Sequence, residues 1–311
     1  FTANVGNDLA ANAAVLSHGR ATIDAQNVNL NADLMSDKNL TITAKNNIFT
    51  KEGTNLSTKS DGRLKARTAD LGGDVRADGT LTIETDEQLT AQNITAGNAT
   101  LKAGAELSVK SVNVGGNADI TAETNLTAND VSVGGDLNAK GQNIHAEHIK
   151  STGKTRLTAT TGNITAKNLS ADGTLDAAAK TNLTVDSVMS KGKTVLTAQT
   201  GDLTVNGTVR TDADAVLTAG QNATLGGKTN VGETLTANVG RDFVTNGAVT
   251  TGKELIANVG NDLAMNDLVS AGGSASLTVG RNATLGGTLT TGGNFTMNVA
   301  HDLTVNDAVT T

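Results

Sequence analysis

The chain has 311 residues, of which only 1% are aromatic, and it contains no Trp, Tyr, Pro or Cys. Globular cores of this length normally use large aromatic side chains to fill their thickness, so the composition excludes conventional thick-cored domains. The formal net charge of −7 argues against nucleic acid as a partner, and we expect no nucleic-acid binding.

Apolar residues that follow an amide or carboxylate residue recur along the whole chain. Their spacing is 18–20 residues, apart from one interval of 23, and every interval from Leu183 onward is 20. A fixed period of about twenty residues is the signature of a solenoid. In chain order these anchor residues are Leu9, Val28, Ile48, Leu71, Leu89, Leu107, Leu126, Ile144, Ile164, Leu183, Leu203, Ala223, Phe243, Leu263, Ala283 and Leu303.

Each repeat reads as three short strands separated by turns, as in LIANVGNDLAMNDLVSAGG at 255–273. Leu255, Ala257 and Val259 alternate with outward residues, as do Leu263 and Met265, which is the period of a strand with one buried face. Parallel strands need long connections, and the other two sides of each coil provide them. The repeat therefore predicts an all-β fold: a right-handed, three-sided parallel β-helix (solenoid) of about 16 coils of 18–20 residues.

We expect residues 1–311 to form a single β-helical array. Coils at 1–182 are irregular and include a charged excursion at 49–67, whereas 183–311 hold strict 20-residue coils. Both ends stop within a repeat and neither shows a polar cap, which predicts a window of a longer filament with adjoining coils on either side. Uncapped strand edges also predict end-to-end self-association.

The position before each anchor residue is an amide or a carboxylate, and we expect a ladder of these side chains along one corner. Short polar side chains tolerate left-handed backbone and hydrogen-bond to local backbone groups, so we interpret the ladder as structural. A line of calcium ligands is disfavoured because the ladder mixes neutral and charged residues. The ladder comprises Asp8, Asn27, Asn47, Asp70, Asn125, Asn143, Asn163, Asn182, Asp202, Asn222, Asp242, Asp262, Asn282 and Asp302, with Gln88 and Glu106 in the two remaining coils.

The run VGRNATLGGTLTTGGNFTMNVAHDLTVNDAVTT at 279–311 resembles the repeats of the filamentous haemagglutinin family. The resemblance covers essentially the whole chain and is strongest from 183 onward. These are large exoproteins of two-partner secretion, including toxin-delivery proteins of contact-dependent growth inhibition. The resemblance implies a right-handed β-helical filament, extracellular or on the Gram-negative cell surface. It further implies export through an outer-membrane partner and a role in adhesion, virulence or toxin display.

Two clusters of residues are candidates for binding chemistry. The excursion at 49–67 carries the candidate partner contacts Lys51, Lys59, Arg63, Lys65 and Arg67, because binding residues favour loops on rigid scaffolds. The alternative is a solvated bulge of a drifting repeat. His145 and His148 flank Glu147 in a segment that reads as a strand and a corner, where residues three apart should point to opposite faces, so we expect exposed, non-functional histidines and no metal site.

The sequence favours a structural stalk that carries a distal receptor-binding or toxin module. The alternative is an adhesive filament face that binds a host or target-cell receptor, a surface protein or a glycan. A polysaccharide-acting β-helix enzyme is a remote alternative, because minimal coils leave nothing to build the walls of an active site. We therefore expect no catalytic residues, no cofactor and no enzymatic activity.

Overall fold

The computed structural model describes all residues, 1–311, and contains no helix. Its strands form parallel stacked coils of a β-solenoid of about 15 turns, which confirms the predicted fold class. The structure therefore holds no helix long and apolar enough to cross a membrane. Two compact units, Phe1–Gly153 and Lys154–Thr311, divide the chain and are described in turn.

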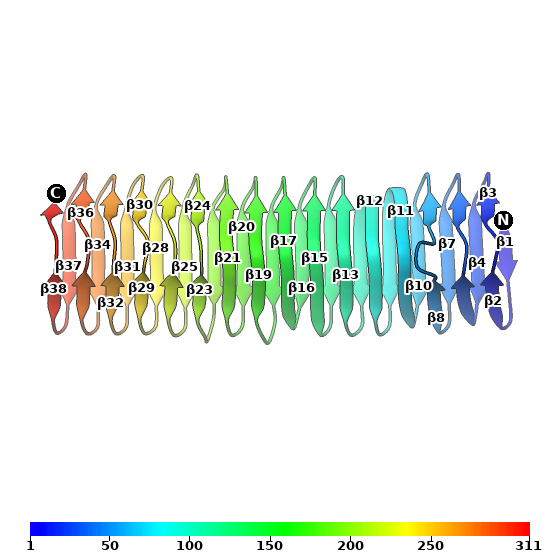
Figure 1. Ribbon diagram of the computed structural model, residues 1–311, viewed down its shortest axis with the longest axis horizontal. Helices are drawn as coiled ribbons and strands as arrows, with labels where there is room; N and C mark the ends of the chain where they lie inside the picture. Colours follow the sequence, from blue (N-terminus) through cyan, green and yellow to red (C-terminus); the bar gives the residue numbers. More distant parts are fainter. The chain divides into compact units, whose positions relative to one another are not determined.

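In the first unit, each coil passes through three faces (Figure 1). In the first three coils, the second and third faces are formed by separate strands. From β11 onward, one continuous strand bends at the corner and contributes to both faces, as Figure 1 shows for β11 and β12. The first face comprises β1 (Thr2–Asn4), β4 (Ala21–Ala25), β7 (Leu40–Ala44), β10 (Gly62–Ala66), β14 (Ala118–Ala122), β16 (Leu137–Gly141) and the ends of β11 and β12. The second face comprises β2 (Asp8–Ala11), β5 (Asn27–Leu30) and β8 (Asn47–Thr50), and the third face β3 (Val15–Ser17), β6 (Leu34–Ser36) and β9 (Leu56–Thr58). The continuous strands are β11 (Thr68–Thr85), β12 (Leu89–Ala103), β13 (Leu107–Val114), β15 (Asn125–Val133) and β17 (Asn143–Ser151).

The second unit repeats this plan with shorter strands (Figure 1). Its first face comprises β18 (Thr155–Ala159), β20 (Leu175–Ala179), β22 (Thr194–Ala198), β25 (Ala215–Ala219), β28 (Leu235–Val239), β31 (Leu255–Val259), β34 (Ala275–Val279) and β37 (Phe295–Val299). The continuous strands β19 (Ile164–Ala171) and β21 (Leu183–Ser190) form the second and third faces at its start. The second face continues as β23 (Leu203–Val205), β26 (Ala223–Leu225), β29 (Phe243–Thr245), β32 (Leu263–Met265), β35 (Ala283–Leu285) and β38 (Leu303–Val305). The third face continues as β24 (Val209–Thr211), β27 (Thr229–Val231), β30 (Val249–Thr251), β33 (Val269–Ala271), β36 (Leu289–Thr291) and β39 (Val309–Thr310).

Alternation along each strand builds the core. In β31, Leu255, Ala257 and Val259 are buried, while Ile256 and Asn258 point outward. Aligned residues of successive coils stack on one another, as Leu235, Leu255 and Ala275 do on the first face. Small aliphatic side chains suit this thin core, because every coil needs to fill only the space between three nearby strands. The three-sided arrangement is confirmed, whereas the handedness of the coil stays a prediction.

From β23 onward the 20-residue coils differ from the earlier ones at the corner between the second and third faces, whereas the coil from Leu183 to Leu203 has its longer corner, 199–202, before β23. In β21, the outward residues Asp186 and Ser187 alone separate the inward Val185 from Val188. From β23 onward, three residues (206–208 in the first such coil) occupy this corner and divide the strand in two. Corner length therefore sets the period, while the strands keep the same alternation.

The predicted register is wrong in one coil. Ala69, rather than Leu71, stacks on Ile48 and Leu89, while Leu71 pairs with Thr50 and Ala91. The interval that begins at Ile48 therefore ends at Ala69 and not at Leu71, which makes it two residues shorter than the 23 expected from the sequence. The ladder position in this coil belongs to Thr68, which pairs with Asn47, and Asp70 lies outside the ladder.

Candidate functional site

The corner ladder is a set of hydrogen bonds between coils. The Oδ1 atom of Asp242 accepts the backbone N–H of Asp262 at 3.2 Å, and Asp262 Oδ1 accepts the N–H of Asn282 at 3.1 Å. Asn182 and Asp202 continue the same pattern in earlier coils, with Asn182 Oδ1 accepting the N–H of Asp202 at 2.9 Å. From Asn163 to Asn282, each ladder side chain thus accepts a corner N–H of the following coil. In the first unit the ladder bonds join side chains, as Asn27 Nδ2 donates to Asp8 Oδ1 at 2.6 Å.

The expected left-handed backbone at the ladder is wrong, because no residue other than Gly53 has a positive φ angle. Amides and carboxylates are interchangeable here since both offer Oδ1 to a backbone N–H. Thr68 fits as well, because its hydroxyl donates to Asn47 Oδ1 at 2.7 Å. The hydrogen bond from Asn282 and then the Arg281 guanidinium lower the pKa of the Asp262 carboxyl.

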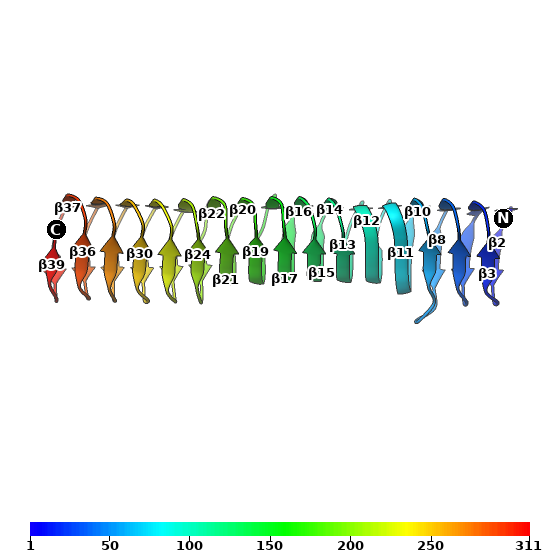
Figure 2. The same cartoon turned by 90° about the horizontal axis from the view of Figure 1, so that it is seen from above.

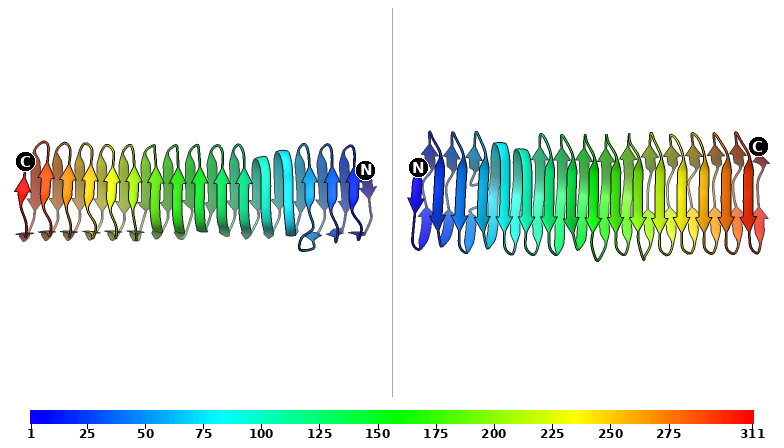
Figure 3. Two further views of the ribbon diagram at one scale, coloured as in Figure 1. Left: turned by 45° about the horizontal axis from the view of Figure 1, so that its top comes forward. Right: turned by 180° about the vertical axis from the view of Figure 1, so that it is seen from behind.

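The charged excursion at 49–67 is mostly regular β-structure. Only residues 51–55, between β8 and β9, leave the coil, and this short loop extends beyond the neighbouring corners in Figures 2 and 3. Gly73 lies beneath it: a Cβ atom there would be 1.9 Å from the Thr54 carbonyl oxygen, so only glycine lets the loop pass. The loop is thus an ordered insertion that is packed on the next coil.

The structure separates the five candidate contact residues. Lys51 is exposed on the loop, whereas Arg63 and Lys65 lie on the first face and Lys59 and Arg67 at two different corners. Arg63 pairs with Glu84 at 3.0 Å and Arg67 with Glu87 at 2.8 Å. The excursion therefore forms no single basic patch, since carboxylates of neighbouring coils offset its charge.

The two flagged histidines are both exposed, because a corner lies between them. His145 is an outward residue of the second face, and His148 begins the third face. The predicted exposure of both histidines, on a strand and a corner, is confirmed, whereas the expectation that they point to opposite faces is wrong. No group of three or more His, Cys, Asp and Glu residues could hold a metal ion.

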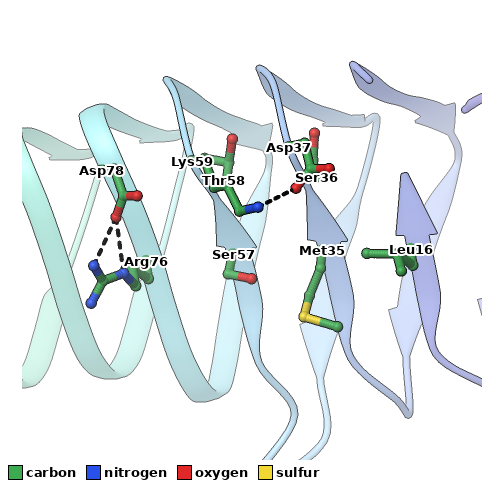
Figure 4. Close-up of a pocket in the computed structure, with 9 residues that line it drawn as sticks. All are labelled: Leu16, Met35, Ser36, Asp37, Ser57, Thr58, Lys59, Arg76 and Asp78. Carbon is green, nitrogen blue, oxygen red and sulfur yellow. Dashed lines mark hydrogen bonds and ion pairs between the residues drawn. The ribbon is translucent and has the colours of Figure 1, made fainter. Parts of the chain in front are cut away.

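A shallow groove opens on the third face of the first unit (Figure 4), and we refer to it as the third-face groove. Its volume is ≈ 330 Å³. Outward residues of four successive coils form one row across it in the order Leu16, Met35, Ser57 and Arg76. The groove is lined by Leu16, Met35, Ser36, Asp37, Ser57, Thr58, Lys59, Arg76 and Asp78.

Apolar and charged side chains lie side by side in the third-face groove. Leu16 is 56% exposed and Met35 is 38% exposed, which is unusual for large apolar residues of this chain. Figure 4 shows the short Ser57 side chain between the longer side chains of Met35 and Arg76. A small residue between two long ones is what hollows the surface at this point.

Ion pairs hold the charged edge of the groove in place. Asp78 Oδ1 accepts a hydrogen bond from Arg76 Nε at 3.0 Å and lies 2.8 Å from Nη2 in the ion pair. Lys59 Nζ lies 2.7 Å from Asp37 Oδ1, and His18 Nδ1 lies 3.0 Å from Asp37 Oδ2. Hydrogen bonds from Lys59 and then His18 lower the pKa of Asp37, and Asp37 raises the pKa of Lys59.

Sequence reasoning missed this groove, although a signal for it exists. The third strands of the first coils read VLS, LMS and LST, and their middle residue points outward. Aligning the third strands by themselves would have revealed apolar residues at an outward position. We aligned the second strands, where the anchor residues are most regular.

Comparisons with known proteins found no relative. No protein-family model matches the chain, no curated protein matches it, and no solved structure matches it.

Proposed function

We propose that the chain is a stalk segment of a large secreted bacterial surface exoprotein, which displays a distal receptor-binding or toxin module. The observation that supports this best is the uniformity of the coils. From β23 to β38, corners of three residues join successive strands. Corners of this length provide no walls for an active site, so the proposal includes no catalytic activity.

Export through an outer-membrane partner and a location on the Gram-negative cell surface are parts of the same proposal. They rest on the resemblance of 279–311 to filamentous haemagglutinin repeats. Regular coils are suited to a spacer, because each coil contacts only its neighbours and the array can be lengthened without a new core.

An adhesive role of the first unit is the second candidate function. It is favoured by the ordered loop at 51–55 and the third-face groove, both of which depart from the uniform surface expected of a stalk. Interface hot spots are enriched in Arg, and the third-face groove contains the exposed Arg76.

Binding of labelled full chain to intact bacterial and epithelial cells separates the two functions. The matched variant replaces residues 51–55 with Asn-Gly-Thr, the corner that joins β23 to β24. A stalk segment shows no saturable binding in either form. Saturable binding that the variant loses, with unchanged circular dichroism, would instead assign adhesion to the first unit.

A further inference from the structure

We propose that the gap above Ser57 in the third-face groove is a binding slot for a single exposed aromatic side chain of a partner protein. The inference depends on the row Met35, Ser57 and Arg76 and is independent of the proposed stalk function. The occupant is a Trp, Tyr or Phe side chain that enters between the thioether of Met35 and the guanidinium of Arg76.

The spacing of the row matches an aromatic ring. Neighbouring strands lie about 4.8 Å apart, so Met35 and Arg76, two coils apart, are separated by about 9.6 Å. A ring halfway between them lies one strand spacing, about 4.8 Å, from the strand of Met35, close to the roughly 5 Å of favourable sulfur–aromatic contacts. The strand that carries Arg76 lies one spacing from the same ring on the other side, against a range of about 6 Å for cation–π contacts.

Arg76 is prepared for this contact. Its side chain is 61% exposed, yet a hydrogen bond and an ion-pair contact to Asp78 Oδ1 hold the guanidinium. A side chain that is already ordered loses little conformational entropy on binding. The positive guanidinium complements the negative face of an aromatic ring, whereas an aliphatic side chain gains nothing from that charge.

The opposite wall of the slot is apolar and extends away from the charged residues. Leu16 lies next to Met35 in the row and is even more exposed than Met35. The ion pair holds the Lys59 ammonium group against Asp37, so this charge is not placed over the apolar side chains of Leu16 and Met35. One side of the slot therefore offers apolar area and the other offers a cation.

The second unit contains a natural control for this geometry. Met189 occupies the same outward position of the third face and is 55% exposed, and the next coil places Arg210 directly beside it. Arg210 also has an aspartate two residues later, Asp212, at 3.9 Å. The same side chains are present there, but no small residue separates them, so no slot exists.

The test uses the full chain labelled with ¹³C at the methionine methyl groups. Acetylated and amidated Gly-Ser-Xaa-Ser-Gly peptides, with Xaa as Trp, Tyr, Phe or Leu, are titrated while the Met35 and Met189 methyl resonances are followed. Peptides with an aromatic Xaa should shift Met35 in a saturable manner and leave Met189 unchanged. The Leu peptide should bind Met35 several-fold more weakly.

Two variants locate the effect. Ser57→Leu fills the slot at a surface position and should abolish the Met35 shift. Arg76→Gln should weaken it about threefold, since exposed cation–π contacts contribute little individually. Equal shifts of Met35 and Met189, equal binding of the Leu and Trp peptides, or an unaffected Ser57→Leu variant would overturn the proposal. A Met35 shift that grows with protein concentration and without peptide would also overturn it, because the occupant would be a second copy of the chain.

Discussion

At the scale of single residues, buried hydroxyl groups stand out in a core made of aliphatic side chains. Most of them have partners, as Thr211 Oγ1 donates to the Gly192 carbonyl oxygen at 2.7 Å. Thr229 and Thr245 are fully buried, yet their Oγ1 atoms have no hydrogen-bond partner. Leaving such a group unpaired costs free energy, because it loses its hydrogen bonds to water on folding.

We therefore expect Thr229→Val to stabilise the protein. Valine has the same shape and removes the unpaired hydroxyl, so the free energy of unfolding should rise by about 1–3 kcal/mol. The rise appears as a higher melting temperature in circular dichroism. Thr211→Val is the matched control and should lower the melting temperature, because it deletes a paired hydroxyl. Shifts of the same sign in both variants would contradict the explanation.

Asp262 is a second residue with a testable role, since it belongs to the corner ladder and to an ion pair. Arg281 Nε lies 3.1 Å from Asp262 Oδ1, and Nη2 lies 2.6 Å from Oδ2. Hydrogen bonds from Asn282 and then Arg281 lower the pKa of Asp262 below its ordinary value of 3.8. The charged carboxylate therefore contributes stability above that value, and the contribution is lost as pH falls through the lower pKa of the folded state.

Asp262→Asn should reduce the loss of stability on acidification below about pH 4. Asparagine keeps an Oδ1 acceptor for the N–H of Asn282, as Asn222 does for Asp242, so the ladder remains intact at neutral pH. Melting temperatures measured from pH 7 to pH 2 should converge for the two proteins at the acid end. If the melting temperature of Asp262→Asn fell as steeply on acidification as that of the unsubstituted chain, the proposed contribution of the Asp262 carboxylate would be excluded.

At the scale of strands and corners, glycine columns allow the coils to stack closely. Gly220, Gly240, Gly260 and Gly280 occupy the same corner position in successive coils. A Cβ atom at Gly260 would lie 2.1 Å from the carbonyl oxygen of Gly240, well inside van der Waals contact. At these glycines the corner backbones approach one another so closely that a side chain would require the backbone to move, and only the last coil has an alanine, Ala300, at this position.

Gly260→Ala should consequently destabilise the second unit. Relief of the contact with Gly240 requires the corner backbone to move, and overpacking of this kind costs about 1–3 kcal/mol. Gly19→Ala is the matched control, since a Cβ atom there meets nothing within 4 Å. Thermal melting of both variants checks the prediction. A tolerated Gly260→Ala would mean that the corners are looser than the structure describes.

At the scale of the whole molecule, the coils are nearly interchangeable. Each coil contacts its neighbours through the same three faces, so stability approximates a sum of coils and of the interfaces between them. The register of Phe243 with Ala223 and Leu263 illustrates the repetition, because all three residues occupy one position of the second face. Removal of one complete coil should therefore leave the remaining contacts in register.

Deletion of residues 243–262 tests this directly. The deletion joins Asp242 to Leu263, which preserves the ladder position and stacks Leu263 on Ala223. The shortened chain should remain soluble, with β-type circular dichroism and a modest decrease in melting temperature. Deletion of 243–252 is the control, because ten residues move first-face strands onto the second face and should prevent folding. Equal tolerance of both deletions would be incompatible with a solenoid of this period.

Much of the architecture could be predicted from local patterns. Alternation of apolar and polar residues indicates which side chains point inward, and the twenty-residue period indicates that one short coil is repeated. Val259 and Leu263 were predicted to be inward residues and are buried. The alternation depends on neighbours within a few positions of the chain, so one repeat shows it, whereas the period emerges from comparison of successive repeats.

Contacts between coils depended on tertiary structure. Asp70–Leu71 matched the local pattern of the ladder, but the loop at 51–55 shifts the register, and burial of Ala69 against Ile48 decides the pairing. The third-face groove has the same origin, because Met35 and Arg76 are brought near each other only by stacking. Hydrogen bonds between coils set that register, and they join residues about twenty positions apart, beyond the reach of local periodicity.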